Sequence, residues 1–122
     1  GLPYHGRTFA RVLLDAIGEF CGPERAAALA SAYREHRVHV GRPPRVGPDG
    51  RLHYGWDERL RLGKGRVLAV SYRDVGGAER DLVGRFSGYE RGWAVLRFEA
   101  ANEPSSTTKV STATVWAVRN VD

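Results

Sequence analysis

The hydrophobic period changes once along this chain, from a helical repeat near the start to a two-residue repeat in the second half. Between positions 7 and 20, apolar residues recur at the i, i+3, i+4, i+7 spacing of one helical face. Residues 23–36 are rich in alanine and follow Gly22-Pro23, which ends one helix and suits the first turn of the next. The sequence therefore predicts two helices joined by a short turn. The first helical face comprises Phe9, Val12, Leu13, Ala16, Ile17 and Phe20.

Extended segments rich in β-branched and aromatic residues begin near Arg66. They cover residues 67–72, 79–89, 93–99, 109–111 and 114–119, and the polar stretch 100–106 is predicted to be a loop. Gly84 and Gly88 interrupt the second segment and predict bends or bulges. Leu96 and Phe98 share one face of the third segment. Short strands on short turns either curl into a barrel or cover one face with helices, and we predict a five-stranded antiparallel barrel.

Between these two patterns lies a segment, residues 37–65, that is punctuated by glycine and proline. Residues 48–50 (Pro-Asp-Gly) predict a tight turn, and Arg51–Tyr54 and Arg59–Leu62 predict short strands. A chain of 122 residues fits one domain. The predicted fold is therefore a single α+β domain, residues 1–122, with a helical unit (7–36), an irregular basic connector (37–65) and a β-barrel (66–122).

One run within the β-rich half, residues 84–90 (GRFSGYE) ahead of the apolar strand 94–96, resembles the first motif of Sm-like proteins. The resemblance implies a small five-stranded barrel over residues 66–119, and SH3-like barrels have similar glycine-aromatic patterns. In Sm-like proteins a turn asparagine and an Arg-Gly pair help to form a uridine pocket. Gly92-Trp93 and Ser111-Thr112 stand at the corresponding places here. The resemblance thus extends to the fold and not to that pocket.

Positive charge is concentrated in the connector and the residue that follows it. The chain has a net charge of +5, and residues 37–66 contain eight basic residues against three acidic ones. Such a segment can follow a phosphate backbone, and aromatic rings within it offer faces for base stacking. The alternative is a solvated loop in an arginine-rich chain. The predicted phosphate contacts are Arg37, Arg42, Arg45, Arg51 and Arg59, and the predicted stacking residues are Tyr54 and Trp56.

Catalytic and metal-binding patterns are weak in this sequence. His36 and His39 lie at and beyond a predicted helix end, so no regular element fixes their spacing for a metal. The single cysteine, Cys21, excludes an intramolecular disulfide and a cysteine-based zinc cluster. We therefore predict no metal, no cofactor and no catalytic residues. A dispersed enzyme site would have to gather His39, His53 or Asp57.

The expected role is non-enzymatic binding of RNA or DNA through the basic connector. The alternative is a protein-interaction or assembly module, ring-forming or accessory to a larger protein, in which exposed strand edges pair between subunits. No apolar run approaches the ~20 residues that span a bilayer, and no secretory leader is visible. With one cysteine, these features favour a cytoplasmic setting and no membrane partner.

Overall fold

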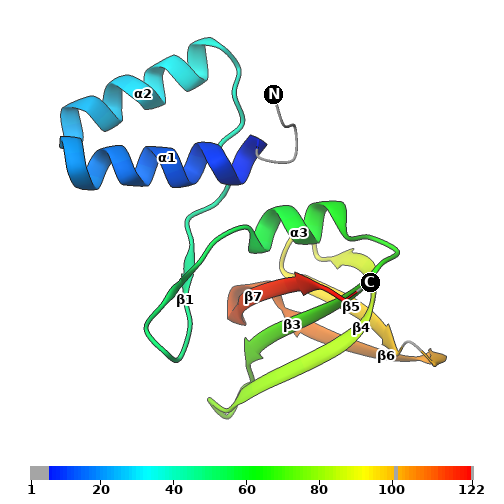
Figure 1. Cartoon of the computed structure of the whole chain (residues 1–122). Helices are drawn as coiled ribbons and strands as arrows, with labels where there is room; N and C mark the ends of the chain where they lie inside the picture. Colours follow the sequence, from blue (N-terminus) through cyan, green and yellow to red (C-terminus); the bar gives the residue numbers. More distant parts are fainter. Residues whose placement is uncertain (1–5, 101, 122) are drawn as a thin grey trace. The chain divides into compact units, whose positions relative to one another are not determined.

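The computed structural model describes residues 6–100 and 102–121, and the chain divides into two compact units (Figure 1). Unit 1 runs through Pro43 and contains two helices. Unit 2 begins at Pro44 and contains a third helix, a two-stranded sheet and a five-stranded antiparallel sheet. The predicted α+β class is confirmed. The boundary falls inside the predicted connector, so the connector arginines are divided between the two units.

Unit 1 consists of α1 (Gly6–Cys21) and α2 (Pro23–Glu35), which confirms both predicted helices. After α2, Arg37 has a positive φ of 56° and Val38 N–H donates to the Tyr33 carbonyl at 2.8 Å, which closes the helix end. The chain then returns to the start of α1. There Gly41 N–H donates to the Arg7 carbonyl at 2.8 Å, so the segment after α2 is tied to α1 by a backbone hydrogen bond.

The five-stranded sheet of unit 2 has the strand order β6-β5-β4-β3-β7, and its paired neighbours are antiparallel. The first four strands follow one another as a meander, and the last strand returns to lie beside the first. The strands are β3 (Val67–Arg73), β4 (Glu79–Glu90), β5 (Val95–Ala100), β6 (Glu103–Ser111) and β7 (Val115–Asn120). The short turn η2 (Thr112–Thr114) links β6 to β7. A small hairpin, β1 (Arg45–Val46) and β2 (Leu52–His53), precedes them.

The core of unit 2 lies on one face of the five-stranded sheet. Leu96 and Phe98 are both buried, as their alternation predicts. The register of β4 against β5 shifts between Phe86 and Gly88, and Gly88 has a φ of 135°, so the predicted bulge is confirmed there. The buried cluster consists of Trp56, Leu60, Leu68, Val70, Phe86, Leu96, Phe98, Val110, Val115 and Val118.

Two members of this core come from α3 (Trp56–Leu62), a helix where the sequence predicted a strand over Arg59–Leu62. That prediction was wrong. Trp56 and Leu60 are one helical turn apart, so a helix buries both side chains against the sheet. Acidic side chains occupy the first turn of α3 and basic ones its last turn, which matches the helix macrodipole.

The predicted loop over residues 100–106 is also wrong for most of its length, because β6 begins at Glu103; Ala101 lies outside the described residues. Pairing with β5 satisfies the backbone of this polar segment, with Glu99 opposite Thr107 and a register shift beyond it. The five-stranded antiparallel sheet is confirmed. Its closure into a barrel is not, since among the described residues no ladder joins the edge strands β6 and β7.

Candidate nucleic-acid interface

Arg45, predicted to contact phosphate, instead binds the edge strand of the sheet. Its Nη1 atom donates to the carbonyl oxygens of Thr112 and Val115, each at 2.5 Å. Its guanidinium carbon lies 3.8 Å from the ring centroid of Trp56. One arginine therefore joins the β1–β2 hairpin, the first residue of α3 and the start of β7. Side chains that occupy edge carbonyls also keep other strands from pairing there.

Arg59 and Trp56 have structural roles as well. Arg59 Nη1 donates to the Tyr54 carbonyl and to the Val118 carbonyl in β7, both at 3.2 Å. Trp56 is 3% exposed, so its ring faces the core and the Arg45 guanidinium. Tyr54 is half-buried beside α3. A ring buried in this way offers no open face for base stacking.

The remaining predicted residues are exposed. Arg37 and Arg42 lie in unit 1, after α2. Arg51 lies in unit 2, with 83% of its side chain exposed and its Nε atom 3.7 Å from Asp49. The seven predicted residues thus form no single patch within either unit.

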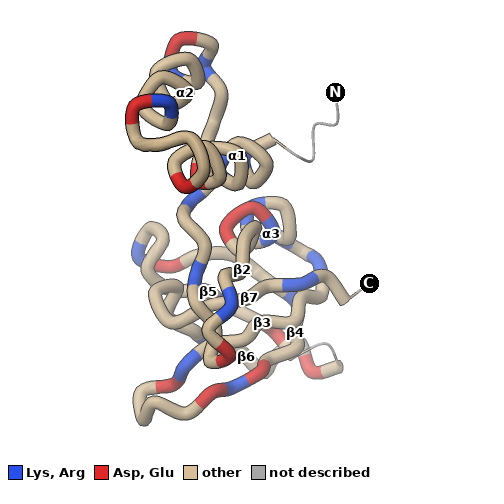
Figure 2. Tube along the Cα trace, turned by 60° about the vertical axis from the view of Figure 1, so that its left-hand side comes forward, with Lys and Arg blue, Asp and Glu red and all other residues tan. Residues whose placement is uncertain are grey.

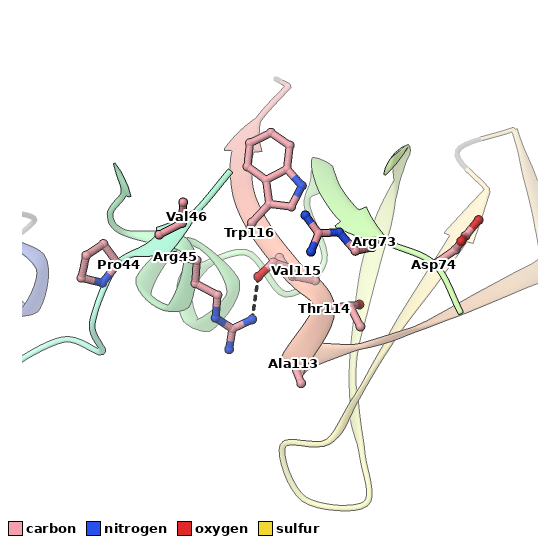
Figure 3. A pocket seen from close by; sticks show the side chains of 9 residues that line it. All are labelled: Pro44, Arg45, Val46, Arg73, Asp74, Ala113, Thr114, Val115 and Trp116. Carbon is pink, nitrogen blue, oxygen red and sulfur yellow. Dashed lines mark hydrogen bonds between the residues drawn. The ribbon is translucent and has the colours of Figure 1, made fainter. Parts of the chain in front are cut away.

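A pocket of about 490 Å³ opens between the β1–β2 hairpin and the ends of β3 and β7 (Figure 3). Its charged groups are already compensated within unit 2. Arg73 pairs with Glu79 at 2.7 Å, and the same carboxylate accepts from Trp116 Nε1 at 2.8 Å. Arg45, which also lines it, binds the Val115 carbonyl, as Figure 3 shows. The pocket therefore offers little unbalanced charge to a ligand.

Asp74, at the rim of this pocket, organises the β3–β4 turn. Its carboxylate accepts from Arg80 Nε at 2.8 Å and from the backbone N–H groups of Ala78 and Gly76 at 2.9 Å each. The Arg80 hydrogen bond, followed by that of Ala78, holds the pKa of Asp74 below its ordinary value of 3.8. Because the folded-state pKa is depressed, the carboxylate stabilises the fold above that value, and the stabilisation is lost as the pH falls through the depressed pKa.

We expect Asp74→Asn to be less stable than the native chain near neutral pH, and the difference should shrink as the pH falls below 3.8. Urea denaturation of both chains at a series of pH values measures it. Asp81→Asn, on the following strand, is the matched control. A stability difference for Asp74→Asn that does not vary with pH would contradict the role of the charge.

Many cations of the sheet are neutralised in the same way as those at the pocket. Each of these side chains lies close to a carboxylate on β4 or in the β3–β4 turn, with N···O distances between 2.7 and 3.3 Å. The pairs are Arg73–Glu79, Arg80–Asp74, Arg97–Glu90 and Lys109–Glu90.

Four exposed cations differ from these, because within the described ranges 6–100 and 102–121 they take part in none of the ion pairs. They are Lys64, Arg66, Arg85 and Arg119, and we call them the basic end. Figure 2 shows Lys and Arg segments gathered where α3 leads into β3, near the C-terminal end of β7. Unbalanced charges within a Debye length of about 10 Å reinforce one another's potential.

Strand register brings the basic end together from distant parts of the sequence. Val67 lies opposite Arg85 on β4, and Ala69 lies opposite Arg119 on β7. Since Val67 and Ala69 are two residues apart, both arginines project from the same face of the sheet. Glu99 is opposite Arg85 on β5, but no ion pair joins the two.

The turn before β3 adds the other two cations. Arg66 accepts the Phe86 N–H through its carbonyl, at 2.9 Å, which continues the β3–β4 pairing to the end of the turn. Arg85 Nη1 donates to the Gly65 carbonyl at 2.6 Å. Lys64 lies over β4, with its Cε atom 3.6 Å from the position that a Cβ would take at Gly88. Lys64 and Arg66 thus precede β3, and Arg85 and Arg119 pair with residues near its first end.

Comparison of the chain with protein-family models, with curated proteins and with solved structures gives no match. The functional argument therefore rests on the chemistry of the side chains.

In the part of the chain that the structure describes, no three His, Cys, Asp or Glu side chains lie close enough to hold a metal ion. Cys21 is exposed at the end of α1. His53 lies edge-on to Trp116, with ring centroids 4.8 Å apart, and its Nε2 atom is 3.8 Å from Asp49. No described helix is long and apolar enough to cross a bilayer.

Two members of the basic end, Arg85 and Arg119, lie outside the basic segment of residues 37–66. Each stands alone among neutral or acidic neighbours in the sequence, so a search for basic runs passes over them. The sequence indicates only that each arginine lies in an extended segment and alternates with core residues, so that its side chain points to the opposite face. That placement becomes informative only when the strand register is known.

Proposed function

We propose that this chain is a non-enzymatic nucleic-acid-binding protein, and that the basic end of unit 2 is its principal phosphate-contacting surface. The observation that carries the proposal is the contrast between this surface and the rest of the sheet. Arg73, Arg80, Arg97 and Lys109 have carboxylate partners, whereas Lys64, Arg66, Arg85 and Arg119 have none within the described residues. Exposed guanidinium and ammonium groups held together without counter-charge attract a polyanion.

The connector arginines support the same role in a different way. Arg37, Arg42 and Arg51 are exposed and stand near the division between the two units. Each unit therefore carries exposed arginines outside the basic end that can make phosphate contacts of their own. Arg45 and Arg59 are left out of this surface, because each guanidinium group binds two backbone carbonyls, whereas that of the exposed Arg85 binds one.

The test is binding to single-stranded and double-stranded RNA and DNA, measured by fluorescence anisotropy over a salt series. We expect the affinity to fall steeply between about 50 and 200 mM salt, because each phosphate contact releases a counterion. In the triple variant Lys64→Ala/Arg66→Ala/Arg119→Ala, the slope of log affinity against log salt should decrease by about 2 to 3. The variant Arg37→Ala/Arg42→Ala/Arg51→Ala tests the connector contribution in the same assay.

The matched control is Arg73→Ala/Arg80→Ala/Lys109→Ala. It removes the same number of positive charges, but from side chains that already have carboxylate partners. We expect the control to keep the native salt slope. Equal losses in the control and in the Lys64/Arg66/Arg119 variant would mean that net charge alone drives binding. Absent or salt-independent affinity of the native chain would overturn the proposal.

We further infer that the five-stranded sheet of unit 2 belongs to a small barrel of the Sm-like or SH3-like kind. The return of β7 beside β3 in the order β6-β5-β4-β3-β7 supports this inference, as does the η2 turn between the last two strands. The bulge at Gly88 and the register shift of β7 near Ser71 bend the sheet in the way that a small barrel requires.

Assembly through protein contacts is the second candidate function. It is favoured by exposed apolar side chains on α1, among them Val12, Leu13 and Phe20. Either function is compatible with the cytoplasmic setting that we propose from the single cysteine.

A further inference from the structure

The pocket between the β1–β2 hairpin and the ends of β3 and β7 has an aromatic wall, the indole ring of Trp116 (Figure 3). This ring is held in place by two neighbours. Its Nε1 atom donates to Glu79 at 2.8 Å, and the His53 ring meets it edge-on with centroids 4.8 Å apart. A fixed aromatic ring suits a flat ligand that stacks on it. Apolar side chains complete the walls, namely Pro44, Val46, Ala113 and Val115.

The polar groups at the pocket favour an uncharged ligand. Arg73 and Asp74 each have a partner of opposite charge, at 2.7 and 2.8 Å, and Arg45 binds backbone carbonyls. The Thr114 hydroxyl donates to the Ser111 carbonyl at 2.8 Å, which leaves its oxygen able to accept a hydrogen bond. A nucleobase matches this lining, because it is flat and uncharged and has donors and acceptors along its edges.

The pocket lies on the same face of the sheet as the arginines of the basic end. Ala69 and Arg73 are separated by an even number of residues on β3, so their side chains project from one face. Ala69 is opposite Arg119, and Arg73 is opposite Glu79, the residue that Trp116 binds. Four residues of β3 at about 3.3 Å each place the pocket about 13 Å from Arg119.

A carboxylate on this face separates the two sites. Asp81 is opposite Ser71 on β3, and accepts from its hydroxyl at 2.7 Å. Because a carboxylate repels phosphate, the backbone of a nucleic acid is favoured at the basic end and disfavoured over Asp81. A base, which carries no charge, is not repelled and can extend to the pocket.

We propose that this pocket receives an unpaired nucleobase, stacked on Trp116, of a single-stranded nucleic acid whose phosphates lie at the basic end. The inference rests on the proposed function and adds to it a preference for single strands. Bases in a duplex are stacked on one another and cannot enter, whereas those of a single strand can be turned out. Trp116 thus has the stacking role that the sequence assigned to Trp56.

The test is fluorescence anisotropy with labelled single strands of RNA and DNA of about 12 nucleotides, and with the corresponding duplexes. Trp116→Ala should weaken binding of the single strands about 10-fold or more, the loss expected for one stacked base. Duplex affinity and the salt slope should not change, because no charge is removed. Trp93→Ala is the matched control, since Trp93 is 51% exposed and does not line the pocket. It should bind as the native chain does.

A second variant guards against a change in folding. Ala113 is exposed at the pocket wall, so Ala113→Leu narrows the pocket while the Trp116 ring stays in place. It should lose single-strand affinity to a similar extent. Thermal denaturation followed by circular dichroism identifies any variant that does not fold, and Ala113→Leu alone decides the outcome if Trp116→Ala is unfolded.

The outcomes separate this inference from the proposed function. A native chain without affinity for nucleic acid would overturn both. Salt-dependent binding that is lost equally in Trp116→Ala and Trp93→Ala, or in neither, would overturn the pocket alone. So would single-strand affinity that survives in a folded Ala113→Leu variant.

Discussion

Replacing Arg45 by alanine should lower the free energy of unfolding of unit 2 by about 3 kcal/mol, as expected when charged hydrogen bonds and a cation–π contact are lost together. The variant leaves the Thr112 and Val115 carbonyls without the donor they have at 2.5 Å. It also uncovers one face of Trp56. Urea denaturation followed by tryptophan fluorescence measures the change.

Arg51→Ala is the matched control for this prediction. Arg51 belongs to the same basic segment, but its side chain is 83% exposed and 3.7 Å from its carboxylate partner, so we expect a change of less than about 0.5 kcal/mol. Arg45→Lys should recover little of the loss, because a lysine has no planar group to stack on the ring. Similar stabilities for the two alanine variants would show that Arg45 is an ordinary surface arginine.

Gly63→Ala should also lower the free energy of unfolding by about 3 kcal/mol, at the upper end of the range for overpacking. Gly63 ends α3, and a Cβ there would lie 2.5 Å from the Arg59 carbonyl oxygen and 2.8 Å from Leu68 Cδ1. Neither neighbour can move easily, since one is helix backbone and the other is a fully buried side chain. The variant must therefore shift α3 away from the sheet, which also disturbs Leu60.

The control is Gly76→Ala in the β3–β4 turn. There the nearest atom to a new Cβ is the Asp74 carboxylate oxygen at 3.4 Å, so we expect a change within about 0.5 kcal/mol. Thermal denaturation followed by circular dichroism compares the two variants. A destabilised Gly76→Ala alongside a native-like Gly63→Ala would mean that the packing of α3 on the sheet is not as described.

Much of the fold could be predicted because local patterns determine it. The spacing of Phe9, Leu13 and Phe20 identifies α1, and the alternation around Leu96 and Phe98 identifies β5 and its buried face. α3 was missed because residues 59–62 alternate charged and apolar side chains, which is also the pattern of a strand. The i, i+4 spacing of Trp56 and Leu60 instead favours a helix, and a helix is formed because it buries both side chains.

The interface was harder to predict than the fold, because adjacency in sequence does not determine where a charged side chain points. Arg45 and Arg51 belong to the same basic segment, yet one binds edge carbonyls and the other extends into solvent. Arg85 and Arg119 are far apart in sequence and are brought to one end of the sheet by β3. Only the pairing of strands, which depends on long-range contacts, makes that surface visible.

The contact between Arg45 and Val115 also constrains when unit 2 can finish folding during synthesis. The two residues are 70 positions apart, so during synthesis Arg45 leaves the ribosome well before the carbonyl that it will bind. Until β7 is complete, β3 lacks one of its two neighbours and remains an unprotected edge. Folding of unit 2 on the ribosome therefore cannot finish before its last strand emerges, and a stalled nascent chain would expose β3 to chaperones or to other nascent chains.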